Sequence, residues 1–189
     1  MRNNISRRDF LAASLKTTLG ACSLAALDPL VWPAADAAAR DAKVRFGFTT
    51  YQWGKDWDLP TTIANLQKAR MFGVELRTSA AYAHGVELAL SAEKRREVKK
   101  RFADSPITLV GIASAERMDW PEPAKLKAAI EAAKAHVKLS HDVGGGGVRI
   151  FPNQWHPNVP HEKTIEQIAK ALNELGASAA DHGQEVRLE

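Results

Sequence analysis

The sequence EVRLE, residues 185–189, alternates charged and apolar side chains along its whole length. Successive side chains of a β-strand point to opposite faces, so Val186 and Leu188 would share one face and the charged residues the other. The same alternation occurs in VELR, residues 74–77, and in GVRIF, residues 147–151. We therefore expect strands with one apolar face that packs on helices and one charged face that does not.

Helical patterns separate these strands along the chain. Apolar residues recur at about one helical turn in the segments between them. Ser91 is a candidate helix N-cap, and Gly73 a candidate helix stop. The predicted strands are 44–49, 74–77, 107–114, 147–151 and 185–189, and the predicted helices occupy 59–73, 91–105, the segment from Pro123, and 162–183. This alternation predicts a parallel sheet with right-handed crossovers.

The charged faces distinguish between two architectures of parallel sheet. A doubly wound sheet carries helices on both faces, so both of its faces should be apolar. A charged inner face favours a barrel lumen, which predicts an α/β fold: a partial (β/α)8 barrel of about four and a half units with strands in the order 1-2-3-4-5. The alternative is an open sheet whose charges flank short edge strands. No G-x-G-x-x-G or P-loop sequence follows the first strand, and GGGG at 144–147 is interpreted as a flexible turn.

The first forty residues have the composition of a targeting segment. SRRDFL at residues 6–11 precedes a moderately apolar stretch and a run of small residues, and it resembles a twin-arginine export signal. We expect residues 1–40 to be this signal, residues 41–189 to be the folded domain, and the protein to be exported to the periplasm by the export machinery. Lys16 and Asp28 interrupt the apolar stretch, which argues against a membrane span. A lipid anchor at Cys22 is the less favoured alternative.

Composition limits the remaining function classes. The chain is 45% apolar and 25% charged, as in soluble globular domains. Its formal charge of +4 is spread over the predicted helices and the N-terminus, so no nucleic-acid partner is expected. A single cysteine excludes an intrachain disulfide and a cysteine metal cluster.

Four segments carry a resemblance to a known family. They are GVELRTSAAYAHGVEL (73–88), LVGIASAE (109–116), LSHDVGGGGVRIFPN (139–153) and GQEVRLE (183–189). With them the chain resembles the xylose-isomerase-like TIM barrels, the sugar phosphate isomerase/epimerase superfamily. The resemblance implies metal-dependent aldose–ketose isomerisation or epimerisation of a small sugar or sugar derivative.

The resemblance also implies a role for Glu189. Barrels of this family place a glutamate that binds a divalent metal at the carboxyl end of the fifth strand, and Glu189 matches that position as metal ligand and catalytic residue. The expected metal is Mn²⁺ or Mg²⁺, with Zn²⁺ as an alternative. Because a complete barrel needs eight units and roughly 250 residues, we expect an N-terminal portion of a longer enzyme. Alone it should be inactive and bind divalent metal weakly or not at all, and its open strand edges should favour self-association.

Candidate substrate-binding residues follow the predicted strands at the end where barrel active sites lie. They are His84, Tyr51, Trp53, Glu116 and Asn153. The segment AERMDW, residues 115–120, keeps the acid expected after the third strand but lacks a histidine, so the substrate stays open. Two alternative functions also stay open: a non-catalytic carbohydrate-binding module, and a metal-dependent hydrolase or endonuclease of the same barrel superfamily.

Overall fold

Five parallel strands form one sheet in the order β1-β2-β3-β4-β5, with helices between them. The structure is a computed structural model that describes residues 44–189. The strands are β1 (Gly47–Thr49), β2 (Gly73–Arg77), β3 (Thr108–Arg117), β4 (Gly147–Phe151) and β5 (Glu185–Leu188). The helices are α3 (Leu59–Lys68), α4 (Ala92–Ala103), α5 (Pro123–Val143) and α6 (His161–Ala180). The predicted fold class and strand order are confirmed.

The predictions for the N-terminal segment, including the export signal and the anchor at Cys22, lie outside the described residues. Within residues 44–189, no helix is long and apolar enough to cross a membrane.

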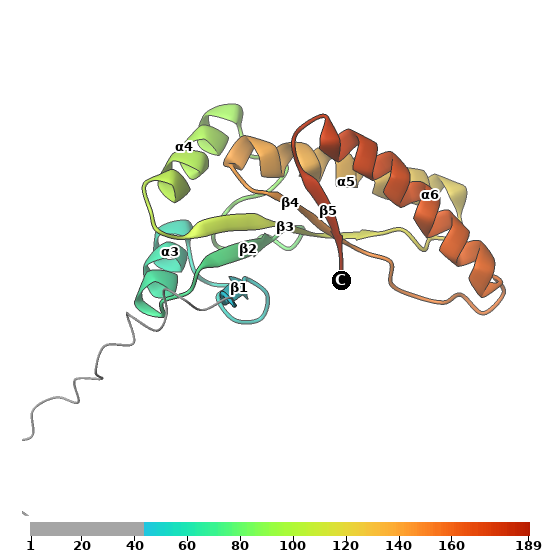
Figure 1. The fold of residues 1–189 in the computed structure, drawn as a ribbon, viewed down its shortest axis with the longest axis horizontal. Coiled ribbons are helices and arrows are strands. Elements are labelled where there is room, and N and C mark those ends of the chain that lie inside the picture. The colour runs from blue at the N-terminus through green and yellow to red at the C-terminus, as the bar shows by residue number, and fades with distance from the viewer. Residues whose placement is uncertain (1–43) are drawn as a thin grey trace, which may run out of the picture. The chain divides into compact units, whose positions relative to one another are not determined.

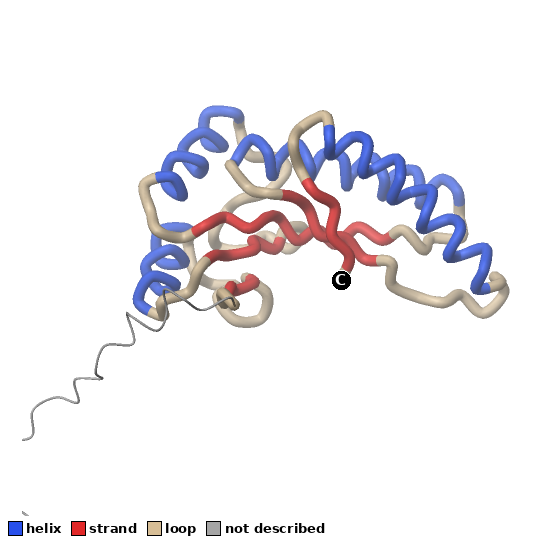
Figure 2. Tube along the Cα trace, in the orientation of Figure 1, coloured by secondary structure: helices blue, strands red, loops and turns tan. Residues whose placement is uncertain are grey.

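Helices α4, α5 and α6 lie along one face of the sheet (Figure 1; Figure 2 shows the strands in red and the helices in blue). The apolar residues of the alternating strands, Val74 and Leu76 in β2 and Val148 and Ile150 in β4, are fully buried in two clusters under these elements. Burying each such side chain contributes about 1.5–3 kcal/mol. Packing of this face therefore confirms the expectation that the apolar side of each alternating strand meets helices.

The first strand is shorter than predicted. Val44 and Phe46 are 68% and 73% exposed, and β1 begins only at Gly47. The reason is register: β1 pairs with β2 alone, and Gly47 is opposite Gly73, the first residue of β2. Before Gly47 one backbone hydrogen bond, from Phe72 N–H to Phe46 O at 2.7 Å, joins the two segments, but it does not extend the ladder. The prediction of a strand from residue 44 is therefore wrong for its first three residues.

The predicted helix stop at Gly73 is also wrong. Helix α3 ends at Lys68, and the chain turns through Arg70 in the left-handed region (φ 54°), while Met71 N–H donates to Leu66 O at 3.0 Å. Gly73 instead opens β2, where a Cβ would lie 2.6 Å from Thr108 O. The glycine is needed because β2 and β3 approach closely at this point.

Two further helix predictions agree with the structure. Ser91 caps α4, since its Oγ accepts a hydrogen bond from Lys94 N–H at 3.3 Å. Pro123 is the first residue of α5, where a missing N–H has no consequence.

Candidate functional site

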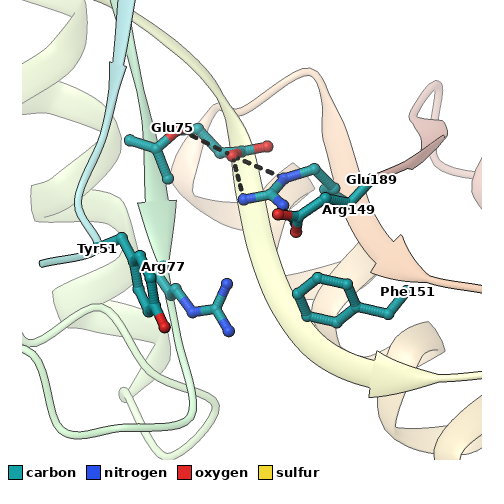
Figure 3. Close-up of a pocket in the computed structure, with 7 residues that line it drawn as sticks. Tyr51, Glu75, Arg77, Arg149, Phe151 and Glu189 are labelled. Carbon is teal, nitrogen blue, oxygen red and sulfur yellow. Dashed lines mark hydrogen bonds and ion pairs between the residues drawn. The ribbon is translucent and has the colours of Figure 1, made fainter. Parts of the chain in front are cut away.

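A hollow of about 580 Å³ lies on the face of the sheet that carries Glu75, Arg77 and Arg149, opposite the buried apolar residues of β2 and β4. None of its lining residues belongs to a helix; all come from strands or from the first two positions after them. The lining residues are Thr49, Tyr51, Glu75, Arg77, Arg149, Phe151 and Glu189 (Figure 3). Because the strands are parallel, their carboxyl ends converge here, at the end where β/α barrels carry their sites.

The centre of the hollow is an ion-paired triad of Glu75, Arg149 and Glu189. Arg149 donates to Glu75 Oε2 from Nε at 2.9 Å and from Nη2 at 2.8 Å. Its Nη1 forms an ion pair with Glu189, and the Thr49 hydroxyl donates to Glu75 Oε2 at 3.2 Å. One guanidinium therefore holds two carboxylates that come from strands far apart in the sequence.

The triad reaches from β2 to β4 because the residues of β3 that lie between them are small. Glu75 is the register partner of Gly111, and Arg149 is the register partner of Ala113. Neighbouring strands are about 4.8 Å apart, so β2 and β4 are separated by about 10 Å. Glycine and alanine in β3 leave that distance open for long side chains to meet, whereas a large side chain at either position would stand between them.

Arg77 occupies the other end of the hollow. Its guanidinium lies over the ring of Tyr51, 4.6 Å from the ring centre, and 5.3 Å from the centre of Phe151. Its backbone N–H donates to the hydroxyl of Thr50 at 2.9 Å. The aromatic contacts and the fixed backbone hold the cation in one place.

His84, predicted to touch substrate, lies outside the hollow and is only 6% exposed. Its Nδ1 accepts from Val86 N–H at 3.1 Å, and its Nε2–H donates to Arg77 O at 3.0 Å. Burial lowers the pKa of His84, and the hydrogen bond to Arg77 offsets this only in part. Both ring nitrogens thus form hydrogen bonds with the backbone, and His84 stabilises the chain at the end of β2.

The other predicted substrate residues lie at different places. Tyr51 lines the hollow, whereas Trp53 is 80% exposed on the following loop. Asn153 has a φ of 72° and lines a separate, smaller hollow beside Trp155. Glu116 lies inside β3, which runs to Arg117 and is longer than predicted, and burial raises its pKa. Glu189 directly follows β5, as expected, and its N–H donates to Ile150 O at 3.2 Å.

A second polar cluster, not predicted from the sequence, surrounds Asp119. Its side chain is fully buried, accepts from Arg117 Nε at 3.1 Å, and lies 2.8 Å from His156 Nε2. Burial alone would raise the pKa of Asp119, but the hydrogen bonds from Arg117 and His156 outweigh it and lower the pKa. The only sequence signal was a short R-x-D spacing at residues 117–119, which has no specific meaning by itself.

The described residues do not make a complete metal site. No group of three histidine, cysteine or acidic side chains comes together within residues 44–189. The two carboxylates of the hollow, Glu75 and Glu189, both contact Arg149. A divalent cation in proteins takes more fixed ligands than these two, so Glu189 fits a metal only as one member of a larger ligand set.

A parallel sheet in sequential strand order, with helices on one face and a polar site toward the strand ends on the other, defines a segment of a β/α barrel. The sequence of residues 63–189 matches the family described as Xylose isomerase-like TIM barrel. The chain belongs to this family.

Solved structures support the same fold. An L-ribulose 3-epimerase is 19% identical with a TM-score of 0.59, covering 77% of this chain and 49% of its own. The IOLI protein with a bound zinc atom is 14% identical with a TM-score of 0.64, covering 77% and 51%. A D-psicose 3-epimerase in the presence of D-fructose is 14% identical with a TM-score of 0.61, covering 76% and 51%. The chain thus spans about half the length of these structures, and no curated protein matches it.

Proposed function

We propose that a complete protein containing this chain is an isomerase or epimerase that acts on a small sugar or sugar derivative. The observation that carries the proposal is the hollow with its two carboxylates, Glu75 and Glu189, toward the strand ends of a family barrel. The similar structures include epimerases of ribulose and psicose, which supports a sugar as the class of substrate.

The residues of the hollow suit this chemistry. Isomerisation and epimerisation move a proton to or from a carbon next to a carbonyl, and carboxylates are suitable acids and bases. We assign that role to Glu189, which is half exposed and open to a ligand, with Arg149 fixing its position. Tyr51 is also half exposed and offers a flat apolar surface for a sugar ring.

We further propose that Glu189 is one ligand of a divalent cation, Mn²⁺, Mg²⁺ or Zn²⁺, in the complete protein. The zinc atom in one similar structure supports this. The remaining ligands would come from outside residues 44–189, so no step of the reaction is assigned to the metal.

The test is a ketose epimerase and aldose–ketose isomerase assay on the complete gene product and on the present chain. We expect turnover by the complete protein that is lost in Glu189→Gln, and none by the present chain. The present chain should bind Mn²⁺ more weakly than the micromolar range, since Glu75 and Glu189, both paired with Arg149, cannot by themselves form a coordination sphere. Micromolar Mn²⁺ binding by the present chain that is lost in Glu189→Gln would contradict the proposal that the remaining ligands come from outside residues 44–189. Full activity of the complete protein in Glu189→Gln would contradict the catalytic role of Glu189.

A non-catalytic carbohydrate-binding module is the second candidate. It is favoured by the way Arg149 occupies both carboxylates of the hollow. Saturable sugar binding by the complete protein, without turnover at any divalent metal, would establish it instead.

We also propose that residues 1–40 export the protein to the periplasm. The support is the SRRDFL sequence at residues 6–11. A reporter fused after residue 40 should reach the periplasm of a bacterium with an active twin-arginine pathway. Replacing both Arg7 and Arg8 by lysine should block this, whereas replacing Lys16 by arginine should not. Export that is unaffected by the double substitution would refute the assignment.

A further inference from the structure

The two arginines of the hollow are in different electrostatic situations. Arg149 contacts both carboxylates that line the hollow. The Arg77 side chain forms no ion pair or hydrogen bond with any residue of the described part of the chain, and its only side-chain partners are aromatic rings. The hollow therefore has a positive end at Arg77, and at its other end a triad in which two carboxylates share the single positive charge of Arg149.

This separation is a property of the fold. Glu75 and Arg77 are two residues apart on β2, so they share the inner face and are natural partners for each other. Glu75 turns away across Gly111 to Arg149 instead, and Glu189 contacts the same arginine from β5. Both acids are thus drawn to Arg149, and within residues 44–189 no carboxylate contacts the Arg77 side chain.

The two aromatic contacts hold the cation without neutralising it. Figure 3 shows the Arg77 guanidinium between Tyr51 and Phe151, directed into the hollow. Rings attract the flat face of a guanidinium but leave the N–H groups at its edge free. That edge is a planar fork whose geometry matches the two oxygens of a carboxylate or a phosphate.

We propose that Arg77 binds an oxyanion, carboxylate or phosphate, carried by the sugar-like ligand of this hollow. The substrate would then be an acidic sugar derivative or a sugar phosphate rather than a neutral sugar such as D-fructose. The oxyanion lies on the Arg77 fork, and the polyhydroxylated part of the ligand extends over Tyr51 toward Arg149 and Glu189. The choice of ligand rests on the proposed function, whereas the oxyanion contact rests on the geometry of Arg77.

The experiment uses the present chain and follows the side-chain Nε–H signal of Arg77 by NMR, assigned by its loss in Arg77→Lys. D-fructose 6-phosphate and D-gluconate should shift this signal saturably, with dissociation constants on the order of 1 mM. D-fructose, which differs from its phosphate by that group alone, should not shift it at equal concentration. Inorganic phosphate should bind through the same arginine but at least about tenfold more weakly.

Three variants complete the test. Arg77→Gln should weaken binding of both acidic ligands by at least about tenfold, and Arg77→Lys should weaken it less, because it keeps the charge and loses the fork. Arg45→Gln is the matched control, since Arg45 also lies over a ring, that of Phe72, but outside the hollow. It should leave binding unchanged.

Three results would overturn the proposal: equal binding of D-fructose and its phosphate, no saturable shift of the Arg77 signal by either acidic ligand, or unchanged affinity in folded Arg77→Gln. Inorganic phosphate binding as tightly as the sugar phosphate would overturn the sugar part of it. Epimerase activity on neutral sugars that is insensitive to Arg77→Gln would refute this inference and leave the proposed function intact. Oxyanion binding at Arg77 in a complete protein that shows no turnover would support this inference and refute the proposed enzymatic function.

Discussion

Arg149 on β4 and Glu75 on β2 are joined by two contacts of 2.9 and 2.8 Å that pass over the strand between them. Both side chains are largely buried, at 15% and 13% exposure. The pair links the β2 and β4 parts of the sheet on the face that α4, α5 and α6 do not cover (Figures 1 and 3).

Replacing Arg149 by methionine should lower the free energy of unfolding by about 2 kcal/mol, because Glu75 would lose the charge that compensates its burial. The measurement is urea denaturation. The double variant Glu75→Gln/Arg149→Met should recover part of the loss, since no uncompensated charge remains. Lys170→Met is the control: it removes an exposed pair with Glu166 and should change stability little. If the changes in unfolding free energy of Arg149→Met and of Glu75→Gln alone add up to that of the double variant, a direct interaction is contradicted.

Gly73→Ala should destabilise the fold by at least about 2 kcal/mol, because the new Cβ would lie 2.6 Å from Thr108 O between two hydrogen-bonded strands. Gly176→Ala is the matched substitution, in α6 with no atom within 4 Å of the added Cβ. It should raise stability by up to about 1 kcal/mol through helix propensity. Thermal melts compare the two, and equal effects would show that strand approach at Gly73 is not limiting.

Stability should decrease as the pH falls below about 6.5, the ordinary pKa of histidine. Burial lowers the pKa of His136, its Nδ1–H donates to Ala132 O at 2.9 Å, and its buried Nε2 has no partner among the described residues. The unfolded chain therefore takes up the proton first, which favours unfolding in acid. His136→Leu should make the loss of melting temperature between pH 7.5 and 5 shallower, by about half, since His84 contributes with the same sign.

Asp119→Asn should lower stability by about 2 kcal/mol at pH 7, because Arg117 and His156 would lose their charged acceptor. The pKa of Asp119 is lowered in the folded state, so its contribution is present above the ordinary aspartate value and is lost as the pH falls through the folded one. The difference between wild type and variant should therefore narrow below about pH 4. Urea denaturation between pH 7 and 3 measures it, and a constant difference would exclude the ionised carboxylate as its source.

The alternation of residue types predicted the sheet well because burial on one face constrains every second residue. The burial of Val148 and Ile150 follows from that rule alone, whereas Glu189, expected as the last residue of its strand, directly follows β5. The rule failed at Val44 and Phe46, where apolar residues alternate but lie before the ladder that joins β1 to β2.

The site was harder to predict because which side chains pair depends on other residues that lie between them in the sheet. Nothing in VELR indicates whether Glu75 pairs with Arg77 or with Arg149; the answer depends on the size of Gly111 and Ala113 in another strand. His84 was a reasonable ligand candidate by position, yet two backbone groups determine its role. Neither kind of information is contained in local sequence.

The small residues Gly111 and Ala113 of β3 allow single substitutions to change the shape of this hollow during evolution. An alanine codon becomes a valine codon by one nucleotide change, and the added methyl groups at position 113 would rise between β2 and β4, where Arg149 now reaches Glu75. Such a change would free Glu75 to pair with Arg77 and leave Arg149 with Glu189, so the hollow would lose its uncompensated arginine without a change in any residue proposed to contact a ligand. Ligand preference in descendants of this chain can therefore drift through a residue that ordinary inspection of the binding groups would overlook.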